Sequence, residues 1–182
     1  MPSAVVAVGG PPGGGKSTAG RSVARALGLE YRSAGDLFRA EAARHLLDLE
    51  AFSHFAETHP EVDRGVDEAM ARLARPGVLL DGRIQGPLLR RRGVPVVAIV
   101  ITAREDVRIR RVASRDRQPL DEAGRRLRER AASERARYLA EYGIDLDREV
   151  GDLTIDSSDL SPAEVHDRLI AFLGERAATG AP

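Results

Sequence analysis

The chain contains no cysteine and few aromatic residues, and each shortage excludes a class of protein. Without cysteine there is no disulfide, no iron–sulfur cluster, no thiolate zinc site and no cysteine nucleophile. Aromatic side chains make up only 4% of the 182 residues, and 28 basic residues balance 28 acidic ones. Such a neutral chain lacks the basic excess and the stacking surfaces of a nucleic-acid binder. No apolar run approaches the roughly 18 residues of a membrane span, and no basic segment precedes an apolar one at the N-terminus. We therefore expect a cytoplasmic protein that binds neither nucleic acid nor membrane.

Lysine is almost absent as well, because Lys16 is the single lysine and every other basic residue is arginine. Arginine carries a wide planar group, whereas lysine carries a narrow, flexible point charge. We therefore expect position 16 to need a cation that an arginine cannot replace.

Short apolar runs alternate with helical patterns along the chain. Strands are predicted at residues 3–8, 29–32, 78–80, 95–102 and 153–156. Helices are predicted at 17–27, 36–49, 51–58, 61–74, 105–142 with a break at 118–119, and 161–173. This alternation is typical of an α/β fold with a five-stranded parallel sheet and helices on both faces. We expect one domain over residues 1–174 and a flexible tail over 175–182.

The strongest motif is Gly-Pro-Pro-Gly-Gly-Gly-Lys-Ser at residues 10–17, which fits the G-x-x-x-x-G-K-[ST] phosphate-loop pattern at every fixed position. The glycines allow successive backbone N–H groups to face an anion, and the following helix adds positive partial charge. Lys16 would reach the β- and γ-phosphates, and the Ser17 hydroxyl would ligate Mg²⁺. The predicted residues for binding the cofactor ATP are Gly10, Pro11, Pro12, Gly13, Gly14, Gly15, Lys16, Ser17 and Thr18.

Other phosphate-loop proteins fit the sequence less well. A guanine-specific GTPase needs an Asn-Lys-x-Asp loop, and therefore a second lysine that this chain lacks. Large motor ATPases need a much longer chain. A small kinase that transfers a phosphoryl group to a small acceptor remains.

Polar residues follow the second and third predicted strands, where an open parallel sheet binds its ligands. Asp36 and Arg39 lie one helical turn apart after the second strand. After the third strand, Asp81 can hold Mg²⁺ through water, and Arg83 can bind an acceptor phosphate through two hydrogen bonds. These positions predict the acceptor side of the site.

An arginine-rich segment runs from Arg104 to Arg137, with 12 arginines and seven acidic residues. Such a segment is either an exposed, charged helix or a lid. A lid would bring positive charge to the transferred phosphoryl group and exclude water, which otherwise competes with the acceptor.

Together these segments resemble the nucleoside monophosphate kinases, and most closely the archaeal-type cytidylate kinases. The matching segments are residues 10–18, 33–39, 52–63 with Asp67, 81–83, 133–138, 142–145 and 161–165. The resemblance extends over about residues 4–173. It implies an adenylate-kinase-like P-loop fold, a three-layer sandwich with an arginine-rich lid. It also implies phosphoryl transfer from Mg·ATP to CMP or dCMP.

By the same resemblance, residues 33–74 would bind the monophosphate and residues 111–137 would form the lid. The predicted substrate-binding residues are Ser33, Gly35, Asp36, Arg39, Asp63, Asp67, Arg83 and Gln85. The predicted catalytic residues are Lys16, Arg83, Arg111, Arg115, Arg130 and Arg137. The predicted metal-binding residues are Ser17 and Asp81. The segment 156–160 would border the adenine of ATP or form a capping loop.

One departure from the family concerns the acceptor pocket. The family typically has Leu-Ala-Gly-Trp after its Gly-Arg, whereas this chain has residues 84–87, Ile-Gln-Gly-Pro. Gln85 would present its amide to a base edge or face solvent. Two alternatives therefore stay open beside a cytidylate kinase: a kinase for a modified cytidylate, another nucleoside monophosphate or another small metabolite, and an ATP-binding adaptor without enzymatic activity. We expect a monomer or a weak homodimer.

Overall fold

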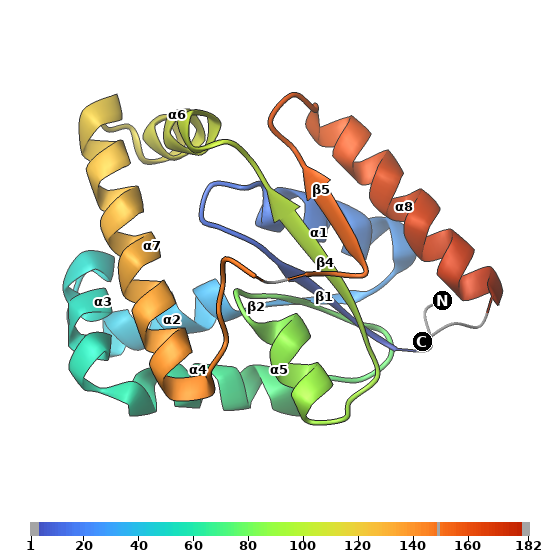
Figure 1. Cartoon of the computed structure of the whole chain (residues 1–182), viewed down its shortest axis with the longest axis horizontal. Coiled ribbons are helices and arrows are strands. Elements are labelled where there is room, and N and C mark those ends of the chain that lie inside the picture. Colours follow the sequence, from blue (N-terminus) through green and yellow to red (C-terminus); the bar gives the residue numbers. More distant parts are fainter. Residues whose placement is uncertain (1–3, 149, 180–182) are drawn as a thin grey trace.

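The computed structural model describes residues 4–148 and 150–179, and within them five parallel strands form one sheet in the order β2-β3-β1-β4-β5 (Figure 1). The predicted α/β fold with a five-stranded parallel sheet is therefore confirmed. The strands are β1 (Val5–Gly9), β2 (Glu30–Ser33), β3 (Val78–Asp81), β4 (Val96–Thr102) and β5 (Leu153–Asp156).

Helices cover both faces of the sheet and also rise beyond the ends of the strands. The helices are α1 (Lys16–Leu27), α2 (Ala34–Arg44), α3 (Leu49–Thr58), α4 (Pro60–Arg72), α5 (Gln85–Arg91), α6 (Glu105–Asp116), α7 (Leu120–Tyr142) and α8 (Pro162–Thr179). No helix within the described ranges is both long and apolar enough to cross a membrane.

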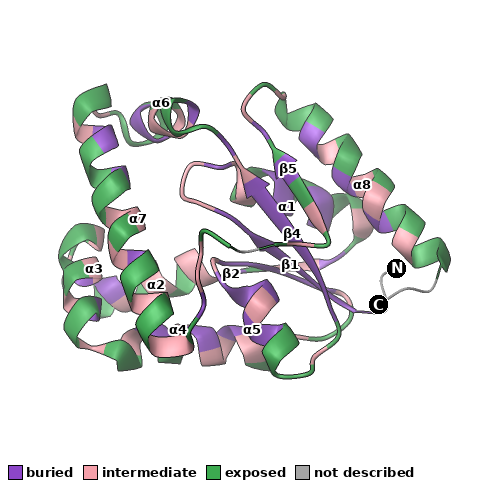
Figure 2. Cartoon of the chain, viewed as in Figure 1, coloured by how far each residue is buried: buried purple, intermediate pink, exposed green. Residues whose placement is uncertain are grey.

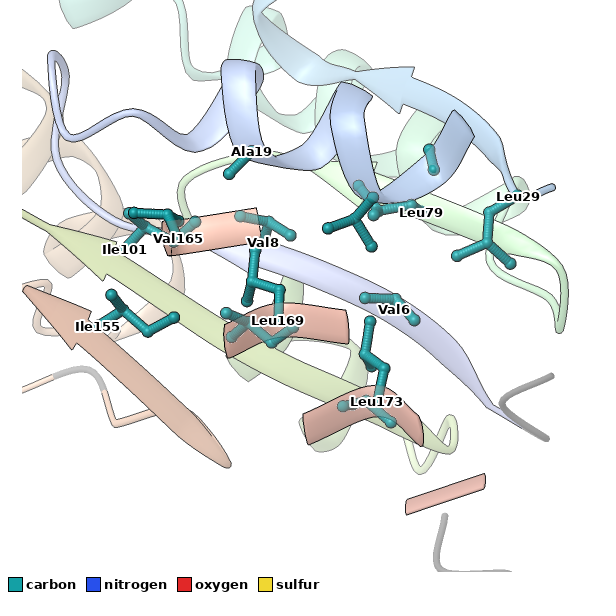
Figure 3. Close-up of a cluster of buried hydrophobic side chains, with 14 of the residues drawn as sticks. Val6, Val8, Ala19, Leu29, Leu79, Ile101, Ile155, Val165, Leu169 and Leu173 are labelled. Carbon is teal, nitrogen blue, oxygen red and sulfur yellow. The ribbon is translucent and has the colours of Figure 1, made fainter. Parts of the chain in front are cut away.

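Two clusters of buried side chains, one on each face of the sheet, hold the three layers together. Because successive side chains of a strand point to opposite faces, Val6 and Val8 of β1 pack against α1 and α8, while Val5 and Ala7 pack against α4 and α5. Figure 3 shows the first cluster, in which side chains spaced four residues apart on α8 reach the strands. Figure 2 shows the central strands β1 and β4 as buried along most of their length.

Several boundaries differ from the sequence prediction, and the helix predicted at 36–49 is observed as Ala34–Arg44. Helix α5 begins at Gln85, where no helix was predicted, because Gly86-Pro87 resembles a turn. A proline in the first turn of a helix is tolerated, since the N–H that it lacks has no partner there. Helix α8 continues to Thr179, so the chain is still helical over most of the predicted tail. Residue 3 and residues 180–182, predicted as strand and tail, lie outside the described residues.

Local signals located three other helix boundaries correctly: the end of α1, the break between α6 and α7, and the start of α8. Gly28 ends α1 in a left-handed conformation, with φ of 63°. The predicted break falls between α6 and α7, where Arg117 has a φ of 54°. At the start of α8, the N–H of Ser161 donates to Glu164 at 2.8 Å, and the N–H of Glu164 donates to the Ser161 hydroxyl at 3.2 Å. This reciprocal pair is a capping box.

The arrangement leaves a space beyond the carboxyl ends of β1, β2, β3 and β4. Helices α2 to α4 border that space on one side, α6 borders it on another, and α7 lies across it (Figure 1). Helix α3 packs against α7, so the two sides meet.

Candidate active site

The loop between β1 and α1 is packed so closely that only glycine fits at several positions. A side chain at Gly10 would place its Cβ 2.1 Å from the carbonyl oxygen of Ile101, and Gly10 has a φ of 122°. At Gly14 the distance to the same oxygen would be 2.7 Å. Gly13, with a φ of 79°, lies equally close to the backbone of Arg108. The end of β4 and the start of α6 therefore hold the loop in its curled form.

Lys16 begins α1 and closes this loop upon itself. Its ammonium group donates a hydrogen bond to the carbonyl of Pro11 at 2.9 Å. Burial lowers the pKa of Lys16 to about 8, although the negative charge of Asp81 works in the opposite direction. The lysine is therefore a weakly hydrated cation at the place where a phosphate chain would lie.

Ser17 and Asp81, the two predicted metal-binding residues, are in contact. The Ser17 hydroxyl donates to Oδ2 of Asp81 at 2.6 Å, and the hydroxyl of Tyr31 donates to the same oxygen. Burial and the charge of Asp81 raise the pKa of Tyr31 to about 12, so it remains a donor. A hydroxyl beside a carboxylate suits Mg²⁺, which usually takes one or two protein ligands and completes its shell with phosphates and water. Across the described ranges, no group of three or more His, Asp or Glu side chains could hold a metal ion instead.

A single cavity of about 710 Å³ brings the predicted residues together. This volume is in the usual range for a small-molecule site. The predicted residues that line it are Pro12, Gly13, Gly14, Gly15, Lys16, Ser17, Thr18, Ser33, Gly35, Arg39, Asp63, Asp81, Arg83, Arg111, Arg115, Arg130 and Arg137. All six residues predicted to be catalytic are among them. Gly10, Pro11, Asp36, Asp67 and Gln85 are not.

At the centre of the cavity, Glu134 of α7 joins two of the predicted catalytic arginines. Nε of Arg83 donates to one of its oxygens at 2.6 Å, and Nε of Arg130 donates to the other at 2.7 Å. The Glu134 side chain is only 6% exposed. Burial by itself would raise the pKa of Glu134, but Arg130 and Arg83 outweigh this effect and hold it at about 2. Glu134 is thus an ionised carboxylate inside the cavity wall.

Farther from the phosphate loop, Arg137 of α7 pairs with Asp63 of α4 at 2.6 Å, and both side chains are nearly buried. Burial raises the pKa of Asp63, and the guanidinium group of Arg137 opposes that shift. Beside this pair, the Ser133 hydroxyl donates to Glu57 of α3 at 2.7 Å. These contacts fasten α7 to the helices on the acceptor side.

Arg111 and Arg115 of α6 approach the cavity from the side of the phosphate loop. Arg111 donates two hydrogen bonds to Ser157, to its hydroxyl at 2.9 Å and to its carbonyl at 2.8 Å. The Ser157 hydroxyl also lies 2.9 Å from the carbonyl of Gly14, within the phosphate loop. Arg115 is exposed and pairs with Asp116 at 2.7 Å. Ser157 therefore connects an arginine of the lid to the loop.

The two sequence interpretations of residues 156–160 both receive some support. Ser157 and Leu160 line the cavity, as a nucleotide-bordering segment would. Ser158 instead accepts a hydrogen bond from the backbone N–H of Arg104 at 2.7 Å, as in a capping loop.

On the acceptor side, Ser33 ends β2 and caps α2 by accepting a hydrogen bond from the N–H of Asp36 at 3.3 Å. Asp36 pairs with Arg39 at 2.6 Å, and both side chains are about half exposed. Gly35 precedes Asp36, and a Cβ there would be 3.5 Å from the Arg39 guanidinium group. The segment thus holds Arg39 at the cavity wall while Asp36 stays outside it.

Gln85 and Asp67 lie behind the cavity wall, which corrects both sequence interpretations of Gln85. The side chain is 1% exposed and donates to Oδ1 of Asp67 at 3.0 Å, so it faces neither a base nor solvent. It is turned inward because it packs against Gly82, where an added Cβ would lie 2.7 Å from its Cγ. Burial raises the pKa of Asp67 to about 7. Oδ2 of Asp67, Oε1 of Gln85 and the hydroxyl of Tyr142 have no hydrogen-bond partner in the described part of the chain.

The aromatic side chains of the acceptor side pack mainly against one another. Phe52 is fully buried, and its ring centroid lies 4.9 Å from that of Phe38 and 5.9 Å from that of Phe55. Of these three, only Phe38 lines the cavity. Phe52 and Phe55 therefore have a packing role, whereas Phe38 is in a position to contact a ligand.

Sequence reasoning missed Glu134 and Tyr31 as parts of this site. A signal for Glu134 was present, because Arg130, Glu134 and Arg137 are spaced by four and three residues and so share one helix face. No comparable signal identified Tyr31, whose contact with Asp81 depends on the pairing of β2 with β3.

Comparison with known proteins places the chain among characterised families. The model of the AAA domain family matches residues 9–128. The chain is 43% identical over 159 residues to a cytidylate kinase of Pyrobaculum arsenaticum, covering 86% of this chain and 85% of that protein. It is 34% identical over 172 residues to a cytidylate kinase of Sulfurisphaera tokodaii, covering 93% and 94%. It is 36% identical over 157 residues to one of Methanocaldococcus jannaschii, covering 85% and 88%.

Among solved structures, the chain resembles two shikimate kinases in fold. The structure from Bacteroides thetaiotaomicron aligns with a TM-score of 0.62 at 15% identity, covering 93% of this chain and 98% of the other. The structure from Acinetobacter baumannii, in complex with shikimate, aligns with a TM-score of 0.62 at 18% identity, covering 95% and 94%. At this identity the likeness concerns the P-loop kinase fold alone.

Proposed function

This chain belongs to the cytidylate kinases, which are nucleoside monophosphate kinases, and from that premise we propose how its cavity transfers the γ-phosphoryl group of ATP to CMP or dCMP. The observation that carries the proposal is that all six predicted catalytic cations line one cavity together with the phosphate loop. Phosphoryl transfer needs mainly positioning and charge stabilisation, and this cavity offers both.

For the donor nucleotide, we propose that the loop at residues 10–15 surrounds the phosphate chain with backbone N–H groups. Lys16 would exchange its contact with the Pro11 carbonyl for the β- and γ-phosphates. Ser17 would bind Mg²⁺ directly and Asp81 would bind it through water, a division that fits their hydrogen bond at 2.6 Å. The ion supplies neutralising charge to the phosphates when bound.

For the acceptor, we propose that Arg39 and Arg83 bind the phosphate of the monophosphate. Ser33 and Gly35 form the wall between the two arginines, and Asp36 orients Arg39 from outside the cavity. Asp63 lines the same side and belongs to the proposed substrate contacts. Asp67 and Gln85 would support this wall from behind.

For the lid, we propose that Arg111, Arg115, Arg130 and Arg137 stabilise the charge on the transferred phosphoryl group. An arginine in such a role accelerates phosphoryl transfer by about 10³- to 10⁵-fold. Helix α7 already meets α3 and α4 through side-chain hydrogen bonds, and we propose that it limits the access of water to the acceptor side of the cavity. No general base is required, because the acceptor phosphate oxygen is already anionic.

The inward position of Gln85 removes the sequence argument for an unrelated acceptor. Residues 84–87 departed from the family pattern, but none of them lines the cavity. Their difference therefore gives no reason to expect a different substrate. Since residues of one chain line the whole cavity, we propose that a monomer is sufficient for activity. Because ATP and CMP are cytoplasmic nucleotides, we expect the reaction to take place in the cytoplasm.

The test is a coupled assay of ADP formation over a panel of acceptors: CMP, dCMP, UMP, AMP and shikimate. We expect CMP or dCMP to give the highest kcat/KM and shikimate to give only background. Arg83→Ala should lower kcat/KM for the monophosphate by at least about 100-fold. Arg92→Ala is the matched control, because Arg92 pairs with Glu68 at the surface and lies outside the cavity. Background turnover with every monophosphate would refute the proposal.

A further inference from the structure

We propose that Glu134 is a positioning residue, whose single carboxylate bridges Arg83 and Arg130 and orients the first toward the acceptor phosphate and the second toward the transferred phosphoryl group. The inference rests on the proposed phosphoryl transfer and adds to it a residue that touches neither nucleotide. Arg83 follows β3 and Arg130 belongs to α7, so the bridge also joins the floor of the cavity to its lid.

The geometry of the bridge is selective, because Glu134 uses only Nε of each arginine. One carboxylate oxygen accepts from Nε of Arg83 at 2.6 Å, and the other accepts from Nε of Arg130 at 2.7 Å. Among the described residues, no Nη atom of either arginine donates a hydrogen bond to a protein group. Both side chains line the cavity, so these donors remain available to phosphate oxygens.

Two other arginines, Arg115 in the cavity wall and Arg104 outside it, are held differently. Nε and Nη2 of Arg115 both donate to Asp116 at 2.7 Å, and the two Nη atoms of Arg104 donate to Asp159 at 2.6 and 2.8 Å. Those pairs occupy the donors that a phosphate needs. Glu134 leaves them unoccupied, which distinguishes a positioning contact from an ordinary ion pair.

Partial burial strengthens the attraction within the bridge, more at Arg83 than at Arg130, whose side chain is 39% exposed. The side chains of Glu134 and Arg83 are 6% and 13% exposed, so solvent screens their attraction only weakly. A single negative charge between two positive ones also leaves the group with net positive charge, and an anion is still attracted to it. An isolated Arg83–Arg130 pair would repel and separate, which would lengthen the path of each donor to the phosphate.

The experiment compares kcat and KM of the full chain and its Glu134→Gln variant in the CMP assay. The amide keeps the shape, but its NH₂ group cannot accept a hydrogen bond from Nε, so one arginine loses its anchor. We expect kcat to fall about 10- to 100-fold, the range for losing a hydrogen bond to a charged group, while KM for ATP does not rise more than about threefold. Glu141→Gln is the matched control, since Glu141 on the same helix pairs with Arg64 at 2.8 Å and both residues lie outside the cavity. It should keep kcat within about twofold.

Two further variants separate positioning from charge and from folding. Glu134→Asp keeps the charge but is one methylene shorter and cannot reach both Nε atoms, so we expect it to be nearly as slow as Glu134→Gln. In a double-mutant cycle, Arg130→Ala should lower kcat at least about fivefold less in the Glu134→Gln background than in the unaltered chain. If Glu134→Gln does not fold, the same cycle is run with Glu134→Asp.

Three results would overturn the inference. They are an unchanged kcat in Glu134→Gln, full activity in Glu134→Asp, and a double variant whose loss of kcat equals the product of the losses in Arg130→Ala and Glu134→Gln within about twofold. Failure of the proposed function would look different, because the unaltered chain would then turn over no monophosphate at all.

Discussion

Replacing Lys16 by methionine should make the protein inactive and more stable at the same time. Methionine is close to lysine in length but carries no charge. The ammonium group of Lys16 is held at the mouth of the phosphate loop for a ligand, and in the empty protein its burial is a cost. Function and stability therefore oppose one another at this residue.

The size of the cost follows from the pKa. Lowering the pKa of Lys16 from 10.5 to about 8 disfavours the charged form in the folded state. At about 1.36 kcal/mol for each pKa unit, this amounts to about 3 kcal/mol near pH 7. Methionine also loses the hydrogen bond to the Pro11 carbonyl, which offsets about 1 kcal/mol. The expected net gain of about 2 kcal/mol corresponds to a rise in Tm of about 4 to 8 °C for a chain of this length.

The assay is a thermal melt of both proteins between pH 7 and pH 10, with turnover measured in parallel. A lysine with a lowered pKa binds fewer protons folded than unfolded above pH 8, so the unaltered chain gains stability as the pH rises from about 8 to 10.5. The Tm advantage of Lys16→Met should therefore shrink by more than half by pH 10. Its kcat should be at least about 100-fold lower at every pH.

Lys16→Arg is the control that keeps the charge. Its guanidinium group is too wide for the curled loop, so we expect low activity without any gain in Tm. A folded Lys16→Met variant with a lower Tm than the unaltered chain at pH 7, or an advantage that grows with pH, would refute the reasoning about burial.

Three other substitutions test the surroundings of the cavity. Burial raises the pKa of Asp67 from 3.8 to about 7, so ionising this group costs folding stability, and the cost grows from pH 3.8 to about pH 7 and is complete above it. Asp67→Asn should therefore raise Tm at pH 8 and leave it unchanged near pH 4. Equal melting curves at pH 8 would contradict this. Ser157→Ala removes the hydroxyl between Arg111 and the Gly14 carbonyl, and it should lower kcat about 5- to 10-fold and Tm by about 2 to 4 °C, measured by turnover and thermal melting. Asp81→Asn should raise the half-saturating Mg²⁺ concentration about tenfold in a titration of activity, and an unchanged titration would remove Asp81 from the metal site.

The fold and the phosphate loop could be predicted because their signals are local. A continuous apolar run such as the one at residues 96–101 is typical of a strand covered on both faces, and the phosphate loop carries its motif within eight consecutive residues, although Ile101 and Arg108 supply the contacts that require its glycines. The predicted cations also came together, since residues at the carboxyl ends of parallel strands share one edge of the sheet.

The orientation of side chains could not be predicted in the same way. Gln85 lies two residues after Arg83, yet the first is buried against Asp67 and the second lines the cavity. The difference arises because α5 begins at Gln85 and turns that side chain inward, and the Gly-Pro sequence concealed this helix. Likewise, no local pattern shows that Glu134 contacts Arg83, which is 51 residues away in the chain.

The pairing of cavity arginines with carboxylates implies two ways of binding a phosphate. The pairs at Arg39 and Arg115 are exposed, with arginine side chains 55% and 65% accessible, and such pairs contribute at most about 1 kcal/mol. A nucleotide phosphate can take these arginines from their partners at little cost. The pairs at Glu134 and Asp63 are buried, and breaking a buried pair costs about 3 to 5 kcal/mol. A phosphate therefore gains more by adding to the unoccupied donors of Arg83 and Arg130 than by displacing Glu134, so the carboxylate stays in place throughout the reaction.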